Sequence, residues 1–563
     1  MISNREIRRM FSLYSKLLQL HAKQPELAAV LSNAAFYARR IKKDIITLDK
    51  SSVEKLFRPA ISKIIIELQH TGNIEALDEL IQLTPAGLFE MMKIKGLGGK
   101  KLLLLWKKAK IDTVDELLKT CKAKQLTGLA GFGAKMQENI VRAIEENNLK
   151  KSHFHYALLA PIAERLVADL QTLTKSPLIS LAGDIRRKTL TLESIEMVAA
   201  MPAKKIIPLL KGRVIVKSST PKRTTGITLD ELPVVIYHAS KQNFPHVLFE
   251  RTGNKAHVEK VQKKIEKTIT WKSEADIYKG AKLPYIVPEM RENLGEWKFK
   301  NYSDLITAAA IKGVVHNHTT YSDGVDTLEN FVRACIDKGY EYTVISDHSR
   351  NAYYAGGLKE DKVIRQWEEI DHLNKTFKPF HIFKSIECDI KVSGELDYDN
   401  QFLKKFDLLI VSIHQLLKMD EDRATKRLIK AIEHPLTTIL GHMTGRLLLI
   451  RPGYPVNHKK IIDACAANRV IIELNANPYR LDMDWTHISY AMQKGVMISI
   501  NPDAHSIKEI DNIRWGIAAA RKGGLTTRMT WNAMNLKEIK KWLAHKNNLG
   551  LSSFFSWLFW HLS

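Results

Sequence analysis

Apolar segments in the second half of the chain alternate with helical stretches and end in polar residues. The segments "YTVISDH", "LLIVSIH", "VIIELNANP" and "VMISINPDAH" read as strands, and "DTLENFVRACIDKG" is typical of the helices between them. This alternation is typical of parallel strand–helix units. Because the carboxyl ends of parallel strands meet on one face, the pattern predicts a barrel-like α/β domain over 311–545 with a site at that face.

The stretch "HNHTTYSDG" is the first candidate metal-binding segment of this domain. His316 and His318 are two residues apart, so on a strand both imidazoles point to one face, as a shared ion requires. Such a pair alone is common on protein surfaces. The other candidates lie in similar short segments and are Asp323, His348, Glu387, His414, His442, Asp503 and His505. Gathering six histidines and three carboxylates without cations would be costly, which favours metal binding.

The ligand types narrow the choice of metal. Imidazole and carboxylate without thiolate suit Zn²⁺, Mn²⁺ or Fe²⁺, and do not distinguish among them. Nine ligands imply several ions, and closely spaced divalent cations usually hydrolyse phosphate esters by activating water and holding the phosphate and leaving oxygens. We expect Asp347 to orient its neighbour, and Cys388 and Asp389 to pack or to support ligands.

Taken in order, "HNHTTYSDG", "ISDHS", "IECDI", "SIHQ", "GHMTGR" and "NPDAH" resemble the motifs of the PHP (polymerase and histidinol phosphatase) domain. That family forms a distorted β/α barrel that holds up to three metals. The resemblance implies a first ion with the catalytic residues His316, His318, Glu387 and Asp503. It implies a second ion at Glu387, His414 and His442, and a third at Asp323, His348 and His505. Val315 and Met443 differ from the family's usual residues but remove no ligand.

Positive charge is concentrated in the first half of the chain. Residues 1–300 hold 52 Lys and Arg against 31 Asp and Glu, whereas residues 301–563 hold 34 against 30. A basic region beside a nearly neutral one predicts a polyanionic partner, and nucleic acid is the commonest. A basic surface without a ligand is the alternative.

Two glycine hairpins, "KIKGLGGKKLLLLW" and "LAGFGAKMQENI", lie in this basic half. Glycine allows close approach of a backbone, and the amides that open the next helix can bind phosphate without reading sequence. This is the helix-hairpin-helix pattern, although a single copy can equally be a tight turn between helices. The predicted DNA-binding residues are Gly96, Gly98, Lys100, Gly131, Gly133 and Lys135.

Hairpins followed by PHP motifs resemble bacterial family X DNA polymerases of the PolX type, over nearly the whole chain. The resemblance implies a multidomain fold. A helical DNA-binding domain would cover 1–78, helix-hairpin-helix fingers 79–150, and an α+β nucleotidyltransferase-like palm and thumb 151–300. The PHP domain would follow over 311–545, and an apolar tail, too short to span a bilayer, over 546–563.

The palm departs from the polymerase pattern. "LAGDIRRKTLTLESIEMV" resembles the nucleotidyltransferase signature, but serine and glutamate take the positions of its aspartate pair, and a glutamate takes the third. Serine cannot bridge two Mg²⁺ ions, and a longer side chain displaces its oxygens by roughly 1 Å, which can cost about 100-fold. Polymerisation is therefore predicted to be weak or lost, with Mg²⁺ required for any that remains. The degenerate site comprises Gly183, Arg186, Arg187, Ser194, Glu196 and Glu231.

The leading hypothesis is a DNA-binding, metal-dependent phosphoesterase, a 3′-5′ exonuclease or 3′-end-processing enzyme in DNA repair. We expect its substrate to be gapped DNA or DNA with a free 3′ end, and Arg446 and Arg480 are candidate phosphate contacts. The alternatives are an active gap-filling polymerase with exonuclease, a non-catalytic DNA-end scaffold and a small-molecule phosphatase. Four separated cysteines and the lack of a signal-peptide core favour a cytoplasmic location without membrane contact. We also expect a monomer.

Overall fold

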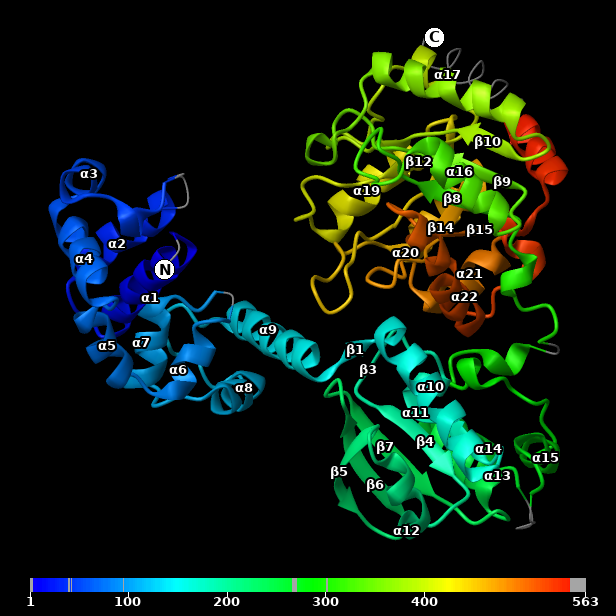
Figure 1. Ribbon diagram of the computed structural model, residues 1–563, viewed down its shortest axis with the longest axis horizontal. Helices are drawn as coiled ribbons and strands as arrows, with labels where there is room; N and C mark the ends of the chain where they lie inside the picture. Colours follow the sequence, from blue (N-terminus) through cyan, green and yellow to red (C-terminus); the bar gives the residue numbers. More distant parts are fainter. Residues whose placement is uncertain are drawn as a thin grey trace. The chain divides into compact units, whose positions relative to one another are not determined.

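The computed structural model describes residues 4–38, 41, 43–94, 96–265, 271–299 and 302–546. It divides into two compact units, residues 1–151 and residues 152–563 (Figure 1). No helix in these described ranges is long and apolar enough to cross a membrane. The predicted apolar tail over 546–563 lies outside the described residues, apart from Lys546.

The first unit consists of short helices around one hydrophobic core. Apolar side chains at helical spacing enter this core, such as Ile7 and Phe11 of the first helix, and Phe132 of the second hairpin joins them. The predicted regions 1–78 and 79–150 therefore share one core. The helices are α1 (Asn4–Leu20), α2 (Pro25–Ala38), α3 (Lys50–Leu56), α4 (Pro59–Thr71), α5 (Glu75–Gln82), α6 (Ala86–Met91), α7 (Gly99–Lys107), α8 (Val114–Lys122) and α9 (Ala134–Ser152).

The second unit begins with a mixed sheet in the order β2-β4-β7-β6-β5. β4 and β7 run parallel, and the other neighbours are antiparallel. This is the α+β palm expected from the sequence. Its strands are β2 (Ile179–Leu181), β4 (Ile195–Ala199), β5 (Val214–Ser219), β6 (Arg223–Thr228) and β7 (Pro233–His238), beside the pair β1 (Phe154–His155) and β3 (Thr191–Leu192). Its helices are α10 (Tyr156–Thr174), α11 (Gly183–Arg186), α12 (Ala203–Ile206), α13 (Phe244–Thr252), α14 (Lys255–Gln262) and α15 (Glu274–Gly280).

The rest of the second unit is an α/β barrel of parallel strands, which confirms the predicted distorted β/α fold. One sheet has the order β10-β9-β8 and the other β11-β12-β13-β14-β15. Isolated parallel bridges, Asn317 to Ala504 and His348 to Glu387, connect the two sheets. The strands are β8 (Gly313–Asn317), β9 (Tyr342–Ile345), β10 (His381–Lys384), β11 (Glu387–Asp389), β12 (Leu409–Ser412), β13 (Thr437–Leu440), β14 (Ile471–Asn475) and β15 (Ile498–Asn501).

Helices follow the barrel strands in alternation and cover the outside of the sheets (Figure 1). Their buried faces supply much of the largest hydrophobic core, for example through Phe331 and Ile462. The helices are α16 (Leu328–Asp337), α17 (Glu360–Thr376), α18 (Asn400–Leu403), α19 (Glu421–Ile432), α20 (His458–Asn468), α21 (Ile488–Gln493) and α22 (Ile513–Lys522).

Helix α22 of the barrel also packs into the palm. Its Ala518 belongs to the palm's hydrophobic core. The ammonium of Lys522, which is 3% exposed, donates to the carbonyl of Arg187 at 3.1 Å and pairs with the carboxylate of Glu292. A buried cation costs free energy unless it is paired, and here palm residues pair it. The barrel and palm are therefore joined by apolar packing and by charge.

Candidate metal centre

The structure brings all nine predicted ligands together at one end of the barrel. Four of them come within three residues of the end of a strand: His318 after β8, His348 after β9, His414 after β12 and His442 after β13. Parallel strands deliver the residues after them to a common rim, which is why ligands far apart in sequence meet here. The remaining five lie in β8, at the start of β11, or in loops, and are His316, Asp323, Glu387, Asp503 and His505.

The carboxylate of Glu387 is the hub of the cluster. Its Oε1 lies 2.9 Å from Nε2 of His442, 3.1 Å from Nε2 of His414 and 3.3 Å from Nε2 of His316. Its Oε2 lies 3.0 Å from Nδ1 of His348. Both oxygens are buried, and neither has a hydrogen-bond partner within the described part of the chain.

Several imidazole nitrogens around this hub are also buried without a hydrogen bond in the described ranges. They include Nε2 of His316 and both ring nitrogens of His318. Orphaned nitrogen and oxygen atoms at these separations cost free energy that cations between them would offset. The donor set therefore fits divalent metal ions, with the mixed imidazole and carboxylate chemistry that suits zinc, manganese or iron.

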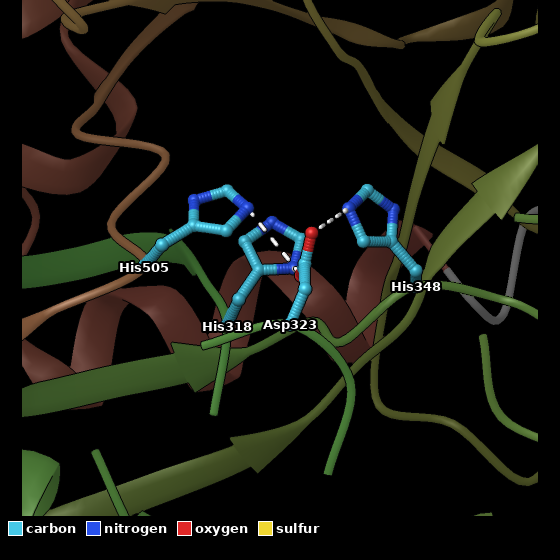
Figure 2. A group of neighbouring side chains, drawn as sticks. All are labelled: His318, Asp323, His348 and His505. Carbon is cyan, nitrogen blue, oxygen red and sulfur yellow. Dashed lines mark ion pairs between the residues drawn. The ribbon is translucent and has the colours of Figure 1, made fainter. Parts of the chain in front are cut away.

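Three groups of side chains have ligand atoms within 4.8 Å of one another, close enough to share an ion. Figure 2 shows one of them, in which Asp323 lies between its histidine neighbours. An Asp323 oxygen is 3.4 Å from Nε2 of His505, and its other oxygen is 3.6 Å from Nε2 of His348. The groups are His318, Asp323, His348 and His505; His316, His318 and Asp503; and His348, Glu387 and His414.

The three groups have more side chains in common than the predicted assignment of ligands to three ions. His318 and His348 each occur in two groups, whereas the prediction gave each to one ion. His442 lies in none of the three, although its Nε2 is close to Glu387. The three candidate sites therefore lie close together and have side chains in common.

Electrostatics affect the ligand groups in different ways. Against the effect of burial, the carboxylates raise the pKa of His348 to about 9 and that of His414 to about 10, so these rings must lose a proton when an ion binds. Glu387 and His318 are already in the forms that bind metal. Burial raises the pKa of Glu387, but the positive charge of His414, His316 and His348 outweighs it and holds that pKa well below the usual value. Burial also lowers the pKa of His318 to about 3. An ionised carboxylate and a neutral imidazole are the forms that offer a lone pair to a cation.

The two ligands His316 and Asp503 lie at unusual backbone positions. Their φ angles are 65° and 52°, in the left-handed region that non-glycine residues rarely adopt. The register of β8 against β9 shifts between Val314 and Asn317. The common direction of His316 and His318 therefore comes from a bulged strand end, not from the regular alternation that the sequence predicted. Such local strain is typical of functional sites.

Sequence reasoning missed Glu473, which supports the centre from β14. One of its oxygens accepts a hydrogen bond from Nδ1 of His316 at 2.6 Å, which directs Nε2 of that ring toward Glu387. Its other oxygen accepts from the amide of His442 at 3.0 Å. A carboxylate behind a ligating histidine fixes the tautomer and orientation of the ring. The signal was present as one glutamate in the apolar run "VIIELN".

Other acidic residues also hold the ligands in place. Asp389 faces Nδ1 of His414 at 2.5 Å, in the supporting role expected of it. Asp347 accepts from the amide and the hydroxyl of Thr319 at 2.8 and 2.7 Å. It thereby fixes the loop that carries Asp323, where the prediction had it orienting its neighbour His348.

The two candidate phosphate contacts have different surroundings. Nη1 of Arg446 lies 2.6 Å from an oxygen of Asp484, so this arginine is engaged in an ion pair. Nε of Arg480 lies 3.4 Å from Oδ2 of Asp503, which brings a cation to the edge of the cluster.

Comparison with known proteins agrees with this site. The PHP domain family matches residues 315–477, and the SAM-like helix-hairpin-helix tandem family matches residues 89–146. The DNA polymerase/3′-5′ exonuclease PolX of Bacillus subtilis is 33% identical over 506 residues, which cover 85% of this chain and 88% of that protein. The chain belongs to the PolX family.

The PHP region of this PolX chain, a metal-dependent phosphoesterase domain, has relatives of its own. A probable phosphatase of Thermoanaerobacter sp. is 25% identical over 38% of this chain and 92% of that protein. A probable phosphatase of Caldanaerobacter subterraneus is 24% identical over 41% of this chain and 90% of that protein. The enzyme therefore joins a hydrolase domain to a helix-hairpin-helix region.

The two arginines of the PolX palm are engaged in ion pairs. Arg186 forms a two-point contact with Glu274, with distances of 2.9 and 2.6 Å. Nε of Arg187 donates to Glu292 at 2.9 Å, and its guanidinium also pairs with Asp184, the residue in the usual serine position. Both guanidinium groups are thereby held by acidic side chains of the same chain.

Glu196 is also held by its neighbours. Its carboxylate accepts a hydrogen bond from the hydroxyl of Tyr237 at 3.1 Å, and burial raises its pKa. It packs against Gly183, where an added Cβ would lie 2.6 Å from the Glu196 carboxyl carbon. Burial thus makes the ionised form of Glu196, the form that binds Mg²⁺, less favourable than it is in water.

The structure does not bring Glu231 to Glu196. Glu231 is exposed on the turn before β7, with a φ of 61°, whereas the strand register pairs Glu196 with Val235. The position across from Glu196 in the palm sheet is thus an apolar residue. Ser194, the other altered position, directly precedes β4 and is half-buried.

The two hairpins of the helix-hairpin-helix tandem contact each other. Gly96 and Gly131 have φ angles of 93° and 85°, which favour glycine. An added Cβ at Gly96 would lie 3.1 Å from Met136 of the other hairpin, and one at Gly131 would lie 3.5 Å from Lys101. Each hairpin glycine therefore packs beside the start of the other hairpin's helix.

The other predicted DNA-binding residues lie at the start of these helices. The carbonyls of Gly98 and Gly133 accept the first helical hydrogen bonds of α7 and α9, at 2.9 Å in each case. Lys100 and Lys135, each the second residue of its helix, are exposed. Both hairpins thus present a helix start and a lysine to solvent, the features that bind a phosphate backbone.

Proposed function

We propose that this PolX chain is a metal-dependent 3′-5′ exonuclease that removes nucleotides from DNA ends, with a palm that no longer supports efficient polymerisation. The observation that carries the proposal is the cluster of buried nitrogen and oxygen atoms around Glu387 that have no hydrogen bond within the described ranges. The name of the Bacillus subtilis relative, which includes 3′-5′ exonuclease, supports the same activity. The basic hairpin region supports DNA as the partner.

Divalent ions bound in this cluster would activate a water molecule and neutralise the charge of the phosphodiester. We propose Mn²⁺ or Zn²⁺, with Fe²⁺ as the alternative, in up to three positions. Glu387 and Asp503 supply the anionic ligands, and the neutral imidazole of His318 supplies a lone pair. Nδ1 of His316 is fixed by Glu473, so that Nε2 faces the cluster.

The proposed reaction is hydrolysis of the last phosphodiester at a 3′ end. The oxygen of water bonds to phosphorus, and the bond from phosphorus to the 3′ oxygen of the penultimate nucleotide breaks. That oxygen takes a proton, and the terminal nucleotide leaves as a 5′-monophosphate. We propose gapped DNA or DNA with a free 3′ end as the substrate, held by the hairpins of residues 79–150.

The state of the palm supports impaired polymerisation. Two-metal nucleotidyl transfer needs carboxylates at fixed positions, and across the palm strands the structure offers Glu196 opposite Val235. Glu196 is already bonded by Tyr237, and Arg186 and Arg187 are engaged by acidic side chains. A gap-filling assay with Mg²⁺ and dNTPs should give little or no extension.

The nuclease proposal is tested with purified protein, Mn²⁺ and DNA labelled at the 3′ end, beside the double variant His316→Ala/His318→Ala. The wild type should release labelled 5′-mononucleotide, and EDTA or the double substitution should abolish the release. A second substrate, labelled at the 5′ end, should give a ladder of fragments shortened from the 3′ side.

Equal release by wild type and double variant would contradict the proposal. Tight DNA binding with no release and less than one equivalent of metal would favour the non-catalytic scaffold. Release of phosphate from small phosphomonoesters, with no cleavage of DNA, would favour the small-molecule phosphatase.

A further inference from the structure

Two exposed tyrosines lie beside the metal centre on the short 3₁₀ helix η6 (Tyr353–Ala355), which follows the ligand His348. Tyr353 is 80% exposed and Tyr354 69% exposed, whereas the flanking Ala352 and Ala355 are buried. The small side chains therefore anchor this turn, and the large aromatic ones are left in solvent. Exposed aromatic rings at a functional site often mark a binding surface.

The turn is firmly held, so the rings have a defined position. The amide of Leu358 donates to the carbonyl of His348 at 2.8 Å, and the amide of Gly357 donates to the carbonyl of Ala352 at 3.1 Å. An added Cβ at Gly357 would lie only 2.0 Å from the carbonyl oxygen of Ser349. Gly357 thus lets the two ends of the loop close tightly.

Tyr354 is the residue of this turn that reaches the metal centre. The centroid of its ring lies 6.2 Å from that of His348 and 6.5 Å from that of His414, two candidate ligands. Nε of Arg480 lies 3.4 Å from Oδ2 of Asp503, a third candidate ligand. The rim of the cluster therefore combines an exposed aromatic ring with a cation.

This combination is the chemistry of single-stranded nucleic acid recognition. Bases stack on aromatic side chains while arginine or lysine holds the backbone, and stacking tolerates every base because each has a π face. The ring of Tyr354, whose centroid lies 6.2 Å from that of His348, is placed to meet a base that flanks the scissile phosphate. A base that is paired and stacked inside a duplex cannot meet it without first opening.

We propose that Tyr354 is a stacking platform for the base next to the scissile phosphate. The inference rests on the proposed exonuclease function and names a positioning residue of that site. Tyr354 acts by positioning DNA, and its ring rather than its hydroxyl is the essential part.

The test measures kcat/KM for wild type and variants on a single-stranded oligonucleotide, a paired duplex end and a single strand whose last two nucleotides are abasic. Base stacking is commonly strong enough that Tyr354→Ala should lower kcat/KM on the single strand roughly 5- to 150-fold. Tyr354→Phe and Tyr354→Trp should keep most of the activity, because they keep the ring.

The abasic substrate provides the decisive comparison. The kcat/KM of wild type on abasic DNA should be about as low as that of Tyr354→Ala on the normal strand. On abasic DNA, Tyr354→Ala should be no slower than wild type, because the ring and the base act as one pair. Tyr353→Ala is the matched control in the same turn and should change kcat/KM less than about twofold. Metal content, measured for each variant, should equal that of wild type.

The outcomes separate the two proposals. If wild type releases no nucleotide from any of these substrates, the proposed exonuclease function fails, and the stacking proposal fails with it. Two other results would overturn only the stacking proposal, with wild type active. In one, Tyr354→Ala lowers kcat/KM equally on all three substrates; in the other, Tyr354→Phe is as impaired as Tyr354→Ala.

Discussion

The PHP centre and the palm centre differ in how their polar groups are satisfied. In the PHP centre, Glu387 and the histidines around it are buried and face one another without hydrogen bonds in the described residues. In the palm, Arg186 is matched by Glu274, and Glu196 by Tyr237. A set of donors and acceptors that satisfies itself needs no ligand, whereas an unsatisfied set requires one. The difference indicates where this chain binds metal.

The largest expected effect concerns the hub of the unsatisfied set. Glu387→Gln removes the anionic charge that four histidines surround, so metal should be lost and nuclease activity should fall by more than about 100-fold, beyond the usual effect of an outer-sphere residue. Metal analysis and release of 3′ label measure both. Glu421→Gln, on the exposed face of α19, is the control. Full metal content in Glu387→Gln would contradict the conclusion that the PHP centre, unlike the palm, needs metal to satisfy its polar groups.

In the satisfied set, removing one partner should affect stability and leave catalysis intact. Arg186→Ala leaves the carboxylate of Glu274 with Arg291 alone, and breaking such a buried pair costs about 3 kcal/mol. Thermal denaturation should show a lower midpoint than wild type, and nuclease activity at 25 °C should change less than about twofold. Arg165→Ala, exposed on α10, serves as control. An unchanged midpoint would show that the ion pair is not structural.

Glu473 connects the two kinds of environment, because it is fully hydrogen-bonded yet supports a ligand. Glu473→Gln weakens the bond that orients His316 and should reduce metal affinity about 10- to 100-fold. Titration of metal-free protein with Mn²⁺, read through nuclease activity, measures the shift. The same maximal rate should return at higher metal concentration, and wild-type affinity would argue against the supporting role.

The smallest effect is expected at the palm carboxylate. Glu196→Gln keeps the shape of the side chain beside Gly183, and nuclease activity should stay within about twofold of wild type. Nucleotide addition, if any is detectable in wild type, should be equally unaffected, since Glu196 is hydrogen-bonded to Tyr237 and lies opposite Val235 and not opposite a second carboxylate. A loss of extension in the variant would show that Glu196 still binds metal.

Most of the candidate ligands could be recognised because they lie beside an apolar run and have a chemically distinctive side chain. The barrel followed from the alternation of strands and helices. The sharing of His318 and His348 between groups could not be predicted, since it depends on side-chain positions in three dimensions. Glu473 was hidden because a single glutamate within a strand has no motif of its own.

Strand register is a second feature that could not be predicted from the sequence. Local sequence gives no pairing partner for a strand, so it could not show that Val235, and not Glu231, lies opposite Glu196. The packing of α22 against the palm could not be predicted either. In the sequence, Ala518 is an ordinary small residue and Lys522 resembles an ordinary surface lysine. Contacts between domains depend on surfaces that no short segment specifies.

The burial of Lys522 bears on how such a chain could evolve. Deleting the palm would leave the apolar face of α22 uncovered and its lysine without Glu292. Helix α22 begins only ten residues after the ligand Asp503, so the damage would fall next to the hydrolytic centre. A palm that had stopped making DNA would therefore still be retained by selection, as a part whose removal harms its neighbour.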